Sequence, residues 1–150
     1  MRKKIGHMRV LLPGCCAVII NQNGEILFQQ RAYPHGKWGL LGGLMELGES
    51  TEETVRREVN EESGLNLGKL TLFGVYSGDG YQCKAQNGDL FDVVTIVYTC
   101  EDFSGDVAVM DDESLAFEWF APDKLPYPIP GTHLEIIRDY QKKCGILPTL

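Results

Sequence analysis

The sequence has no apolar run long enough to cross a membrane as a helix. Such a helix needs about 20 consecutive apolar residues, whereas Pro13 and Gly14 interrupt the apolar stretch that follows the basic N-terminal segment, residues 1–9. An asparagine-rich turn pattern follows at residues 21–24, so the continuous apolar region and the cleavage site of a secretory signal peptide are missing too. We therefore expect a cytoplasmic protein that makes no contact with a membrane.

Basic residues are scarce as well. The 150 residues include 14 Lys and Arg against 21 Asp and Glu, which gives a formal net charge of -7 at pH 7. Binding to a nucleic acid polymer depends on clustered positive charge, so we expect no such partner. A small anionic molecule can still bind where a metal ion or a local basic group neutralises its charge.

The five cysteines form no C-x-x-C pair, and their number is odd. This pattern is a poor framework for disulfides or for a zinc site, so we expect free thiols in a reducing compartment. The neighbouring Cys15 and Cys16 lie in an apolar segment that is typical of a strand, where their side chains would point to opposite faces.

The length and the 43% hydrophobic content predict a single domain spanning residues 1–150, because one core fits this length and two do not. Strand-like segments interleave with two helical ones, which predicts an α/β sandwich with a mixed sheet. In chain order we expect strands at 15–20 and 25–31, a loop-rich region with several glycines at 33–48, and a helix at 50–63. Strands at 70–76 and 90–100 follow, joined by a long hairpin loop at 77–89, and then a short strand at 116–120. A proline-rich stretch at 122–130 leads to a helix at 132–143, with Leu134, Ile137 and Tyr140 near one face.

The clearest helix starts at Ser50 with a capping box. The Ser50 hydroxyl can accept an amide hydrogen bond while Glu53 reaches back to the start of the helix. Gly64 stands where a helix often ends on a residue in the left-handed conformation. These signals fix both ends of the helix.

Three carboxylates lie on one side of this helix. At 100° per residue, Glu58, Glu61 and Glu62 fall within an arc of roughly 100°, at the border of the stripe formed by Val55 and Val59. The valines are expected to face the core. Like charges three and four residues apart destabilise a helix, and a cluster of hard oxygen ligands suits Mg²⁺ or Mn²⁺.

The segment around this helix resembles a known motif. Starting from Gly43, the sequence has five residues, Glu49, seven residues, and then the run Arg57-Glu58-Val59-Asn60-Glu61-Glu62-Ser63-Gly64-Leu65. This resembles the Nudix box, G-x5-E-x7-R-E-U-x-E-E-x-G-U with U aliphatic, at every defined position. The alternative is a solvated acidic helix beside a glycine-rich loop. Only the 23 residues at 43–65 carry a specific resemblance, although the rest of the chain agrees in outline.

The resemblance implies a Nudix-type α/β/α sandwich with a central mixed β-sheet and a catalytic loop-helix-loop. It implies Mg²⁺, with Mn²⁺ as an alternative, bound mainly by Glu58 and Glu62. Glu61 would contribute directly or through water, and the backbone carbonyl of Gly42 would complete the site. Many relatives have Pro-Gly-Gly at the entry to the motif, where this chain has Leu41-Gly42-Gly43; the glycines that permit close backbone approach remain, so Gly43 is a candidate substrate contact.

Further roles follow from the resemblance with alternatives beside them. Arg57 would pair with Glu49 and hold the carboxylates in place, or it would form a surface pair with Glu61, or both. Glu113 is the favoured general base, although acids on an exposed loop are common. Arg31, at the end of a strand, would reach a substrate phosphate, or it would be a charge in solvent.

The aromatic residues and histidines give less information. Half-exposed aromatic side chains next to loops can stack on a base but are commonly plain surface; the candidates are Tyr33, Tyr76, Tyr81 and Phe91. His133 is expected at the start of the last helix, without a part in catalysis.

The function implied is a Mg²⁺-dependent pyrophosphohydrolase that cleaves a phosphoanhydride bond in a nucleoside diphosphate linked to another group. Modified nucleoside triphosphates and ADP-ribose are the leading substrate classes, and a homodimer is one way to complete the cleft for the second. A different class of function is a non-catalytic nucleotide-sensing regulator with the same fold, and another is an acidic module that binds calcium or a partner protein. The full set of motif residues favours the enzyme.

Overall fold

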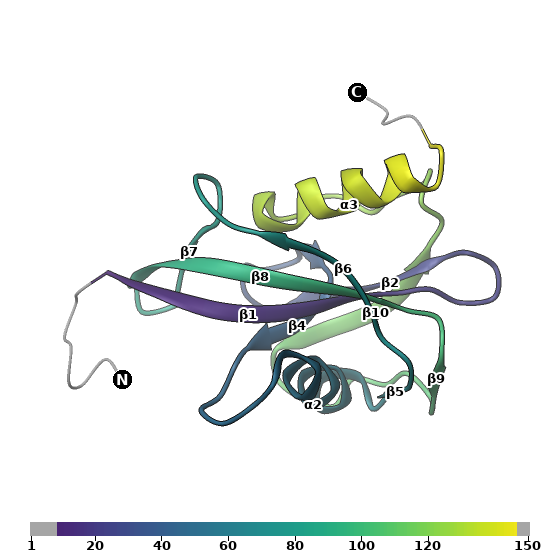
Figure 1. The fold of residues 1–150 in the computed structure, drawn as a ribbon, viewed down its shortest axis with the longest axis horizontal. Coiled ribbons are helices and arrows are strands. Elements are labelled where there is room, and N and C mark those ends of the chain that lie inside the picture. Colours follow the sequence, from purple (N-terminus) through teal and green to yellow (C-terminus); the bar gives the residue numbers. More distant parts are fainter. Residues whose placement is uncertain (1–8, 147–150) are drawn as a thin grey trace.

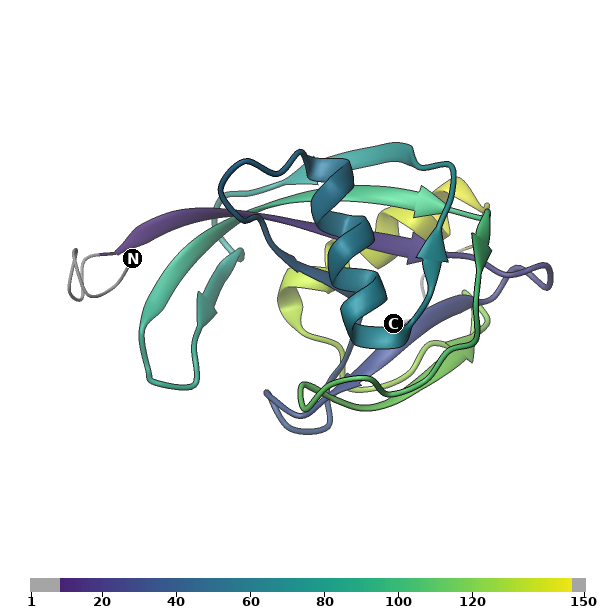
Figure 2. The same ribbon diagram turned by 90° about the horizontal axis from the view of Figure 1, so that it is seen from below.

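The computed structural model describes residues 9–146. Helices α2 (Thr51–Ser63) and α3 (Gly131–Lys143) lie on opposite sides of the strands, so the fold is an α/β/α sandwich (Figure 1). Seen from below, α2 crosses the strands of the central sheet at a steep angle (Figure 2). The strands are β1 (Val10–Ile19), β2 (Ile26–Arg31), β3 (Trp38–Gly39), β4 (Leu41–Leu44), β5 (Asn66–Leu67), β6 (Thr71–Tyr76), β7 (Gln82–Lys84), β8 (Leu90–Cys100), β9 (Phe103–Ser104) and β10 (Ser114–Phe120).

The central sheet is mixed, as the sequence predicted. It has five strands in the order β4-β1-β8-β6, with β7 pairing to β8. The long strands β1 and β8 run parallel, from Val10 opposite Phe91 to Ile19 opposite Cys100, and the other pairs of this sheet are antiparallel. A second sheet has the order β10-β2-β3, and β5 pairs with β9. Helix α2 packs against β1 and β4 of the central sheet.

Strand β1 separates two hydrophobic clusters because its side chains alternate between the faces of the sheet. Cys16, Val18 and Ile20 pack in the cluster that includes Ile136 and Ile137 of α3. The alternate residues pack on the α2 side; they are Cys15, Ala17 and Ile19, together with Val55, Val59 and Leu65. The expectation that Cys15 and Cys16 point to opposite faces is confirmed. All five cysteines have free thiols.

The predicted capping of α2 is also confirmed. The Glu53 N–H donates to the Ser50 hydroxyl at 3.1 Å, and the Ser50 N–H donates to the Glu53 carboxylate at 3.0 Å. Gly64 ends the helix with φ 83°, and its N–H donates to the Asn60 carbonyl at 2.9 Å. Val55 is fully buried against the core. The capping residues thus set where the acidic side chains of this helix project.

The strand expected at 15–20 begins earlier, and the segment expected to be loop-rich holds two strands. Strand β1 begins at Val10, not at residue 15, because residues 10–19 pair with β8. Pro13 lies beyond the pairing with β4, which covers only Gly14 to Ala17. A missing N–H costs little there. The segment 33–48 is not all loop, since β3 and β4 lie within it. A side chain at Gly42, which has φ 157°, would overlap the Cys15 carbonyl, so glycine allows close strand pairing here.

Three smaller corrections concern the rest of the chain. The expected long loop at 77–89 contains β7, which extends β8 as a short hairpin. The strand expected at 116–120 begins at Ser114, and the last helix begins at Gly131. In α3 the buried aliphatic residues are Ile136 and Ile137, while Leu134 is half-buried. No helix of the described residues is long and apolar enough to span a bilayer.

Candidate functional site

Arg57 organises the acidic side chains of α2. Its Nε donates to one Glu49 oxygen at 2.6 Å and its Nη2 to the other at 3.0 Å, which is a bidentate pair. Its Nη1 donates to Glu58 at 2.9 Å and to Glu61 at 3.3 Å, and its Nη2 also donates to the Leu44 carbonyl at 3.2 Å. Both pairings expected for Arg57, with Glu49 and with Glu61, are therefore present.

Glu49 is held by several donors from the loop that precedes α2. Besides Arg57, the Glu46 N–H at 2.9 Å and the Thr54 hydroxyl at 3.0 Å donate to it. These donors, Arg57 first, lower the pKa of Glu49 to about 2. Glu49 is thus a fixed anion whose role is to anchor Arg57.

Glu58 lies against the backbone of Gly43. A Cβ at Gly43 would stand 2.6 Å from both carboxylate oxygens of Glu58, so only glycine leaves room for this carboxylate. Burial raises the pKa of Glu58, and Glu61 and Glu113 add to that effect, whereas Arg57 opposes it. The Glu58 carboxylate is therefore close to the β4 backbone and surrounded by other acids.

Glu62 is the most buried acid of the site, with only 3% of its surface exposed. One oxygen accepts from the Gly42 N–H at 3.0 Å and the other from Gln29 Nε2 at 3.0 Å. Gln29 Nε2 also donates to the Ser114 hydroxyl at 2.6 Å. Burial is the main reason that the pKa of Glu62 rises to about 8, and the charge of Glu58 contributes.

The donor set fits a hard divalent cation. Glu58 and Glu62 offer carboxylate oxygens, which Mg²⁺ and Mn²⁺ prefer, and burial raises the pKa of both more than the nearby arginines lower it. Across residues 9–146 no three carboxylates, thiols or imidazoles are already gathered into a metal site. Protein donors hold Glu58 and Glu62, and the side chain of Glu61 is 56% exposed beside Arg57. A third ligand would come from Glu61 by rotation or from the Gly42 carbonyl.

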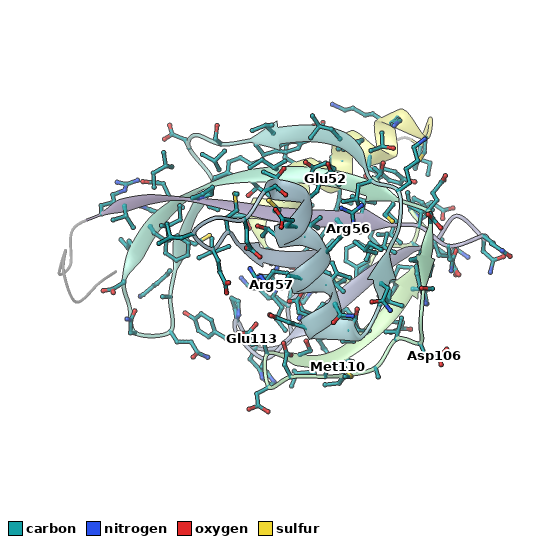
Figure 3. The ribbon with its side chains drawn as sticks, turned by 60° about the horizontal axis from the view of Figure 1, so that its bottom comes forward. Glu52, Arg56, Arg57, Asp106, Met110 and Glu113 are labelled. Carbon is teal, nitrogen blue, oxygen red and sulfur yellow. The ribbon has the colours of Figure 1, made fainter. Side chains whose placement is uncertain are left out.

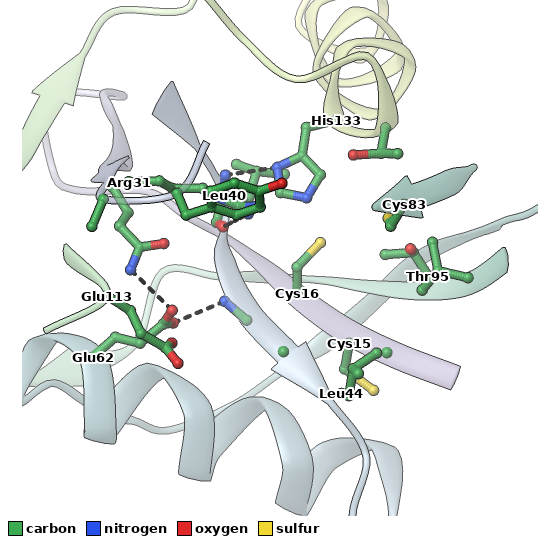
Figure 4. Close-up of a pocket in the computed structure, with 18 of the residues that line it drawn as sticks. Cys15, Cys16, Arg31, Leu40, Leu44, Glu62, Cys83, Thr95, Glu113 and His133 are labelled. Atoms are coloured by element: carbon green, nitrogen blue, oxygen red, sulfur yellow. Dashed lines mark hydrogen bonds between the residues drawn. The ribbon is translucent and has the colours of Figure 1, made fainter. Parts of the chain in front are cut away.

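Glu62 lines a cleft of about 610 Å³ (Figure 4), and Glu58 stands beside it against Gly43, another lining residue. Glu113, Arg31 and His133 also line the cleft. Other residues of its lining include Tyr33, Phe91, Cys16, Cys83 and Thr95. Of the aromatic candidates, Tyr33 and Phe91 line this cleft, whereas Tyr76 and Tyr81 are buried and donate to Asp139 and Glu135 of α3.

Arg31 is half-buried in the wall of the cleft, so its charge is not fully solvated. Its Nε has no hydrogen-bond partner, the one such case among the buried side-chain nitrogen and oxygen atoms of the described residues. Its Nη2 reaches the Leu40 carbonyl at 3.4 Å. Burial lowers the pKa of Arg31, and the charge of Glu62 opposes this change. The guanidinium is therefore available to an anionic or hydrogen-bond-accepting ligand.

Glu113 lies on the loop that runs beside the C-terminal end of α2 (Figure 3). The Ala108 N–H donates to the Ser63 carbonyl at 2.9 Å and the Met110 N–H to the Glu62 carbonyl at 3.3 Å. These bonds attach the loop to the helix. Glu113 is exposed and lines the cleft, and its charge contributes to the raised pKa of Glu58.

Three residues of the site were not predicted from the sequence. Gln29 and Ser114 hold Glu62, and His133 accepts from the Leu40 N–H at 3.0 Å through Nδ1 while lining the cleft. Gln29 could have been found, because it is a polar residue in an apolar strand and shares a face with Arg31 two positions later. The position of His133 depends on the packing of α3, for which the local sequence holds no signal.

Comparisons with known proteins agree with this geometry. The model of the NUDIX domain matches residues 10–140 of the chain. A "MutT-like protein" of Streptomyces ambofaciens is 35% identical over 108 residues, which cover 72% of this chain and 62% of that protein. The ADP-ribose pyrophosphatase of Methanocaldococcus jannaschii is 32% identical over 137 residues, which cover 91% of this chain and 75% of that protein.

Among solved structures, a MutT NUDIX hydrolase from Burkholderia pseudomallei superposes on this fold with a TM-score of 0.73 and 34% sequence identity. The superposition covers 85% of this chain and 96% of that one. The similarity thus extends over the sheets and α2 as well as the acidic motif.

Proposed function

Since the chain belongs to the NUDIX family of hydrolases, we propose that it is a Mg²⁺-dependent pyrophosphohydrolase acting on a small nucleotide. The bond cleaved would be a phosphoanhydride in a nucleoside diphosphate linked to another group. The proposed substrate classes are modified nucleoside triphosphates and ADP-ribose-like molecules. The relative from M. jannaschii is named an ADP-ribose pyrophosphatase.

One observation supports this proposal above the others. Glu62, an acid with a raised pKa, lines a cleft, and Glu58, also with a raised pKa, stands beside it against Gly43. A half-buried arginine with an unpaired Nε, Arg31, stands in the wall of the same cleft. A diphosphate with its metal ion can lie between these acids and the guanidinium. An acidic helix on the protein surface would have neither buried carboxylates nor an arginine in the same cleft.

The residues of the site would have the following roles. Glu58 and Glu62 would hold the metal ion, with Glu61 and the Gly42 carbonyl as further oxygen ligands. When bound, the ion would supply the positive charge that phosphoanhydride cleavage requires. Arg57 holds Glu58 in position through its own bidentate pair with Glu49.

Glu113 is proposed as the group that accepts a proton from the attacking water. It is exposed at the rim of the cleft and close enough to Glu58 to affect its pKa. Asp112 is also exposed and also lines the cleft. Glu113→Gln and Asp112→Asn therefore form a matched pair: a large loss of kcat is expected for Glu113→Gln alone.

The main test is hydrolysis of a panel of nucleoside diphosphate derivatives with Mg²⁺, including ADP-ribose and oxidised nucleoside triphosphates. Glu58→Gln and Glu62→Gln are each expected to lower kcat at least about a hundred-fold, because each removes one charged ligand, and a metal ion displaced by about 1 Å costs this much. Glu52→Gln is the control on the same helix, since Glu52 is exposed and pairs only with Arg56.

Equal turnover by the wild type and both ligand variants would overturn the proposed site. Tight binding of a nucleotide without turnover of any member of the panel would favour the nucleotide-sensing regulator over the enzyme. Calorimetric titration of the wild type with the same panel separates these outcomes, because binding is measured whether or not hydrolysis follows.

A further inference from the structure

The side chain of Gln29 connects α2 to the loop that carries Glu113. Gln29 lies on β2 and is 2% exposed. Its Nε2 donates to Glu62 at 3.0 Å, a dashed line in Figure 4, and to the Ser114 hydroxyl at 2.6 Å. An amide nitrogen has two hydrogens, so each of them has an acceptor. An ionised Glu62 can only accept, which is why the nitrogen of the amide, and not its oxygen, faces this carboxylate.

The connection continues from Ser114 to the backbone of Glu113. Because the Ser114 oxygen accepts from Gln29, its own hydrogen can be donated, and it is donated to Asp111 Oδ1 at 3.1 Å. The same oxygen of Asp111 accepts from the Glu113 N–H at 3.1 Å. Three consecutive hydrogen bonds therefore join the Gln29 amide to Glu113. We call the three residues that form this link the Gln29 relay: Gln29, Ser114 and Asp111.

Backbone contacts hold the same loop from two sides. The Ala32 N–H, just beyond β2, donates to the Glu113 carbonyl at 2.9 Å. The Met110 N–H donates to the Glu62 carbonyl at 3.3 Å. Glu62 is thus bonded to the loop through its own carbonyl and, by way of Gln29, through its carboxylate. The carboxylate link alone depends on side chains, so substitutions can remove it while the backbone contacts stay.

A shift in strand pairing brings Ser114 to Gln29. Strand β10 pairs with β2 in regular register as far as Ala116, and the register then shifts so that Ser114, rather than Leu115, lies opposite Arg31. Residues opposite each other on paired strands share a face, and so do residues two apart on one strand. Ser114 therefore lies on the same face as Gln29. Regular pairing would place Leu115 there, and such bulges often re-aim a side chain next to an active site.

We propose that the Gln29 relay positions Glu113 relative to Glu62. The attacking water has to lie within reach of both the ion held by Glu62 and the base that accepts its proton. A displacement of about 1 Å can lower a rate about a hundred-fold, so a loop that carries the base needs a fixed distance to the metal ligand. The members of the relay are positioning residues and not catalytic ones. This inference rests on the proposed function, because it takes Glu62 as a metal ligand and Glu113 as the base.

Asp111 provides the sharpest test, since one of its oxygens carries two bonds of the relay. Asp111→Asn keeps an oxygen that accepts from the Ser114 hydroxyl and the Glu113 N–H, whereas Asp111→Ala removes it. Asp111→Ala is expected to lower kcat at least about ten-fold, with KM for the substrate changed by less than about three-fold. Asp111→Asn should restore most of the rate. Equal losses in the two variants, as expected if Asp111 acts through its charge, would overturn the proposal, and so would an unchanged kcat in Asp111→Ala.

The two ends of the relay differ in their expected effect on the metal ion. Ser114→Ala leaves Gln29 bonded to Glu62, so kcat should fall while the Mg²⁺ concentration for half-maximal rate stays unchanged. Gln29→Leu also removes a donor from Glu62, so this concentration should change by at least about three-fold in addition to the loss of kcat. The control is Gln30→Leu, because the Gln30 amide donates to the Gly36 carbonyl outside the relay. The same Mg²⁺ requirement in Ser114→Ala and Gln29→Leu would overturn the link to Glu62.

A measurement without substrate or metal ion tests the relay itself. The exchange rate of the Glu113 amide hydrogen is measured by NMR through magnetisation transfer from water, on the whole chain. Ser114→Ala and Gln29→Leu are expected to raise it at least about five-fold, because the Asp111 acceptor is no longer held. The Asn23 N–H, which bonds to Asn21 Oδ1 at 3.0 Å in the same kind of turn, should not change.

An unchanged Glu113 exchange rate in a folded Ser114→Ala protein would overturn the proposal. If Gln29→Leu fails to fold, Ser114→Ala and the two Asp111 variants still decide it. Exchange does not require hydrolysis, so the two proposals can fail separately. Faster exchange in a chain that cleaves no member of the substrate panel would refute the proposed function and leave the relay standing.

Discussion

Replacing Glu62 by glutamine should stabilise the metal-free protein while it abolishes hydrolysis. Glu62 is 3% exposed, and burial raises its pKa to about 8 from an ordinary value of 4.5. Between pH 4.5 and 7 the carboxyl is ionised in the unfolded chain and stays protonated in the fold. The free energy of unfolding therefore falls by about 1.4 kcal/mol per pH unit. The fold is therefore destabilised at pH 7 by about 3 kcal/mol, an upper limit to what glutamine can recover.

The sign of the pH dependence follows from the same shift. A carboxyl whose pKa is raised by folding contributes most at a pH below its unfolded pKa, and stability falls as the pH rises from about 4.5 to about 8. Glutamine does not titrate, so the difference in unfolding free energy between Glu62→Gln and the wild type should grow over this range. At pH 8 the melting temperature of the variant should be higher by roughly 5–10 °C.

Thermal or urea unfolding in the presence of a chelator, at several pH values from 5 to 8, measures this difference. Glu52→Gln on the exposed side of the same helix is the control, and its difference from the wild type should not depend on pH in this range. A Glu62→Gln protein that is less stable than the wild type at pH 8, or a difference that is constant from pH 5 to 8, would refute the reasoning.

Four further predictions follow from the same contacts. Gly42→Ala should lower the free energy of unfolding by about 2–4 kcal/mol, since its Cβ would overlap the β1 backbone at a strained φ. In Gly43→Ala the new Cβ meets only the end of the Glu58 carboxylate, so this variant should lose mainly kcat. Equal melting temperatures of the two variants would contradict this contrast. Arg57→Lys should lower kcat about ten- to a hundred-fold, because lysine cannot form the bidentate pair with Glu49, and a kinetic assay at saturating substrate measures it. The pKa of Glu49 is about 2 in the fold, below its ordinary value of 4.5. In acid unfolding, the stability advantage of the wild type over Glu49→Gln should therefore be full above pH 4.5. It should disappear as the pH falls towards 2. Tyr81→Phe removes the hydroxyl that donates to Glu135 at 2.5 Å and should cost about 1–3 kcal/mol in urea unfolding.

The part of the site that one helix carries was predictable from the sequence. Residue spacing alone places Glu58 and Glu62 one turn apart on α2, and the capping box fixes where that turn begins. The expected contact of Arg57 with Glu49 is a short-range one across the loop before the helix. Local periodicity and capping are sufficient for such features because each depends on residues close in the chain.

The parts that were not predictable depend on contacts between distant segments. Glycine and proline signals suggested loops at residues 33–48 and before residue 15. Pairing with β8 extends β1 back to Val10, and pairing with β2 and β1 makes β3 and β4 strands within 33–48. A tight backbone contact needs glycine for the same reason that a turn does, so the composition could not distinguish the two. The position of His133 beside Arg31 depends on how α3 packs, 102 residues along the chain from Arg31.

Helix α2 is stable for reasons that do not depend on its charges. Ser50 and Gly64 cap its two ends, and the side chains of Val55 and Val59 are fully buried. Burial of two valines and two sound caps together contribute several kcal/mol at about 1–2 kcal/mol each. This leaves the helix able to carry side chains that are unfavourable where they stand.

Those unfavourable side chains gather at one end. Glu52 and Glu53 suit the positive N-terminal end of the helix dipole, but the last turn has no basic residue and carries Glu61 and Glu62 instead. Glu58 and Glu62 also repel each other one turn apart. A divalent cation between them would remove both conflicts at once, so Mg²⁺ should raise the melting temperature of the wild type. The same addition should leave a protein with both Glu58→Gln and Glu62→Gln unchanged, because that variant has already lost the charges that the ion would compensate.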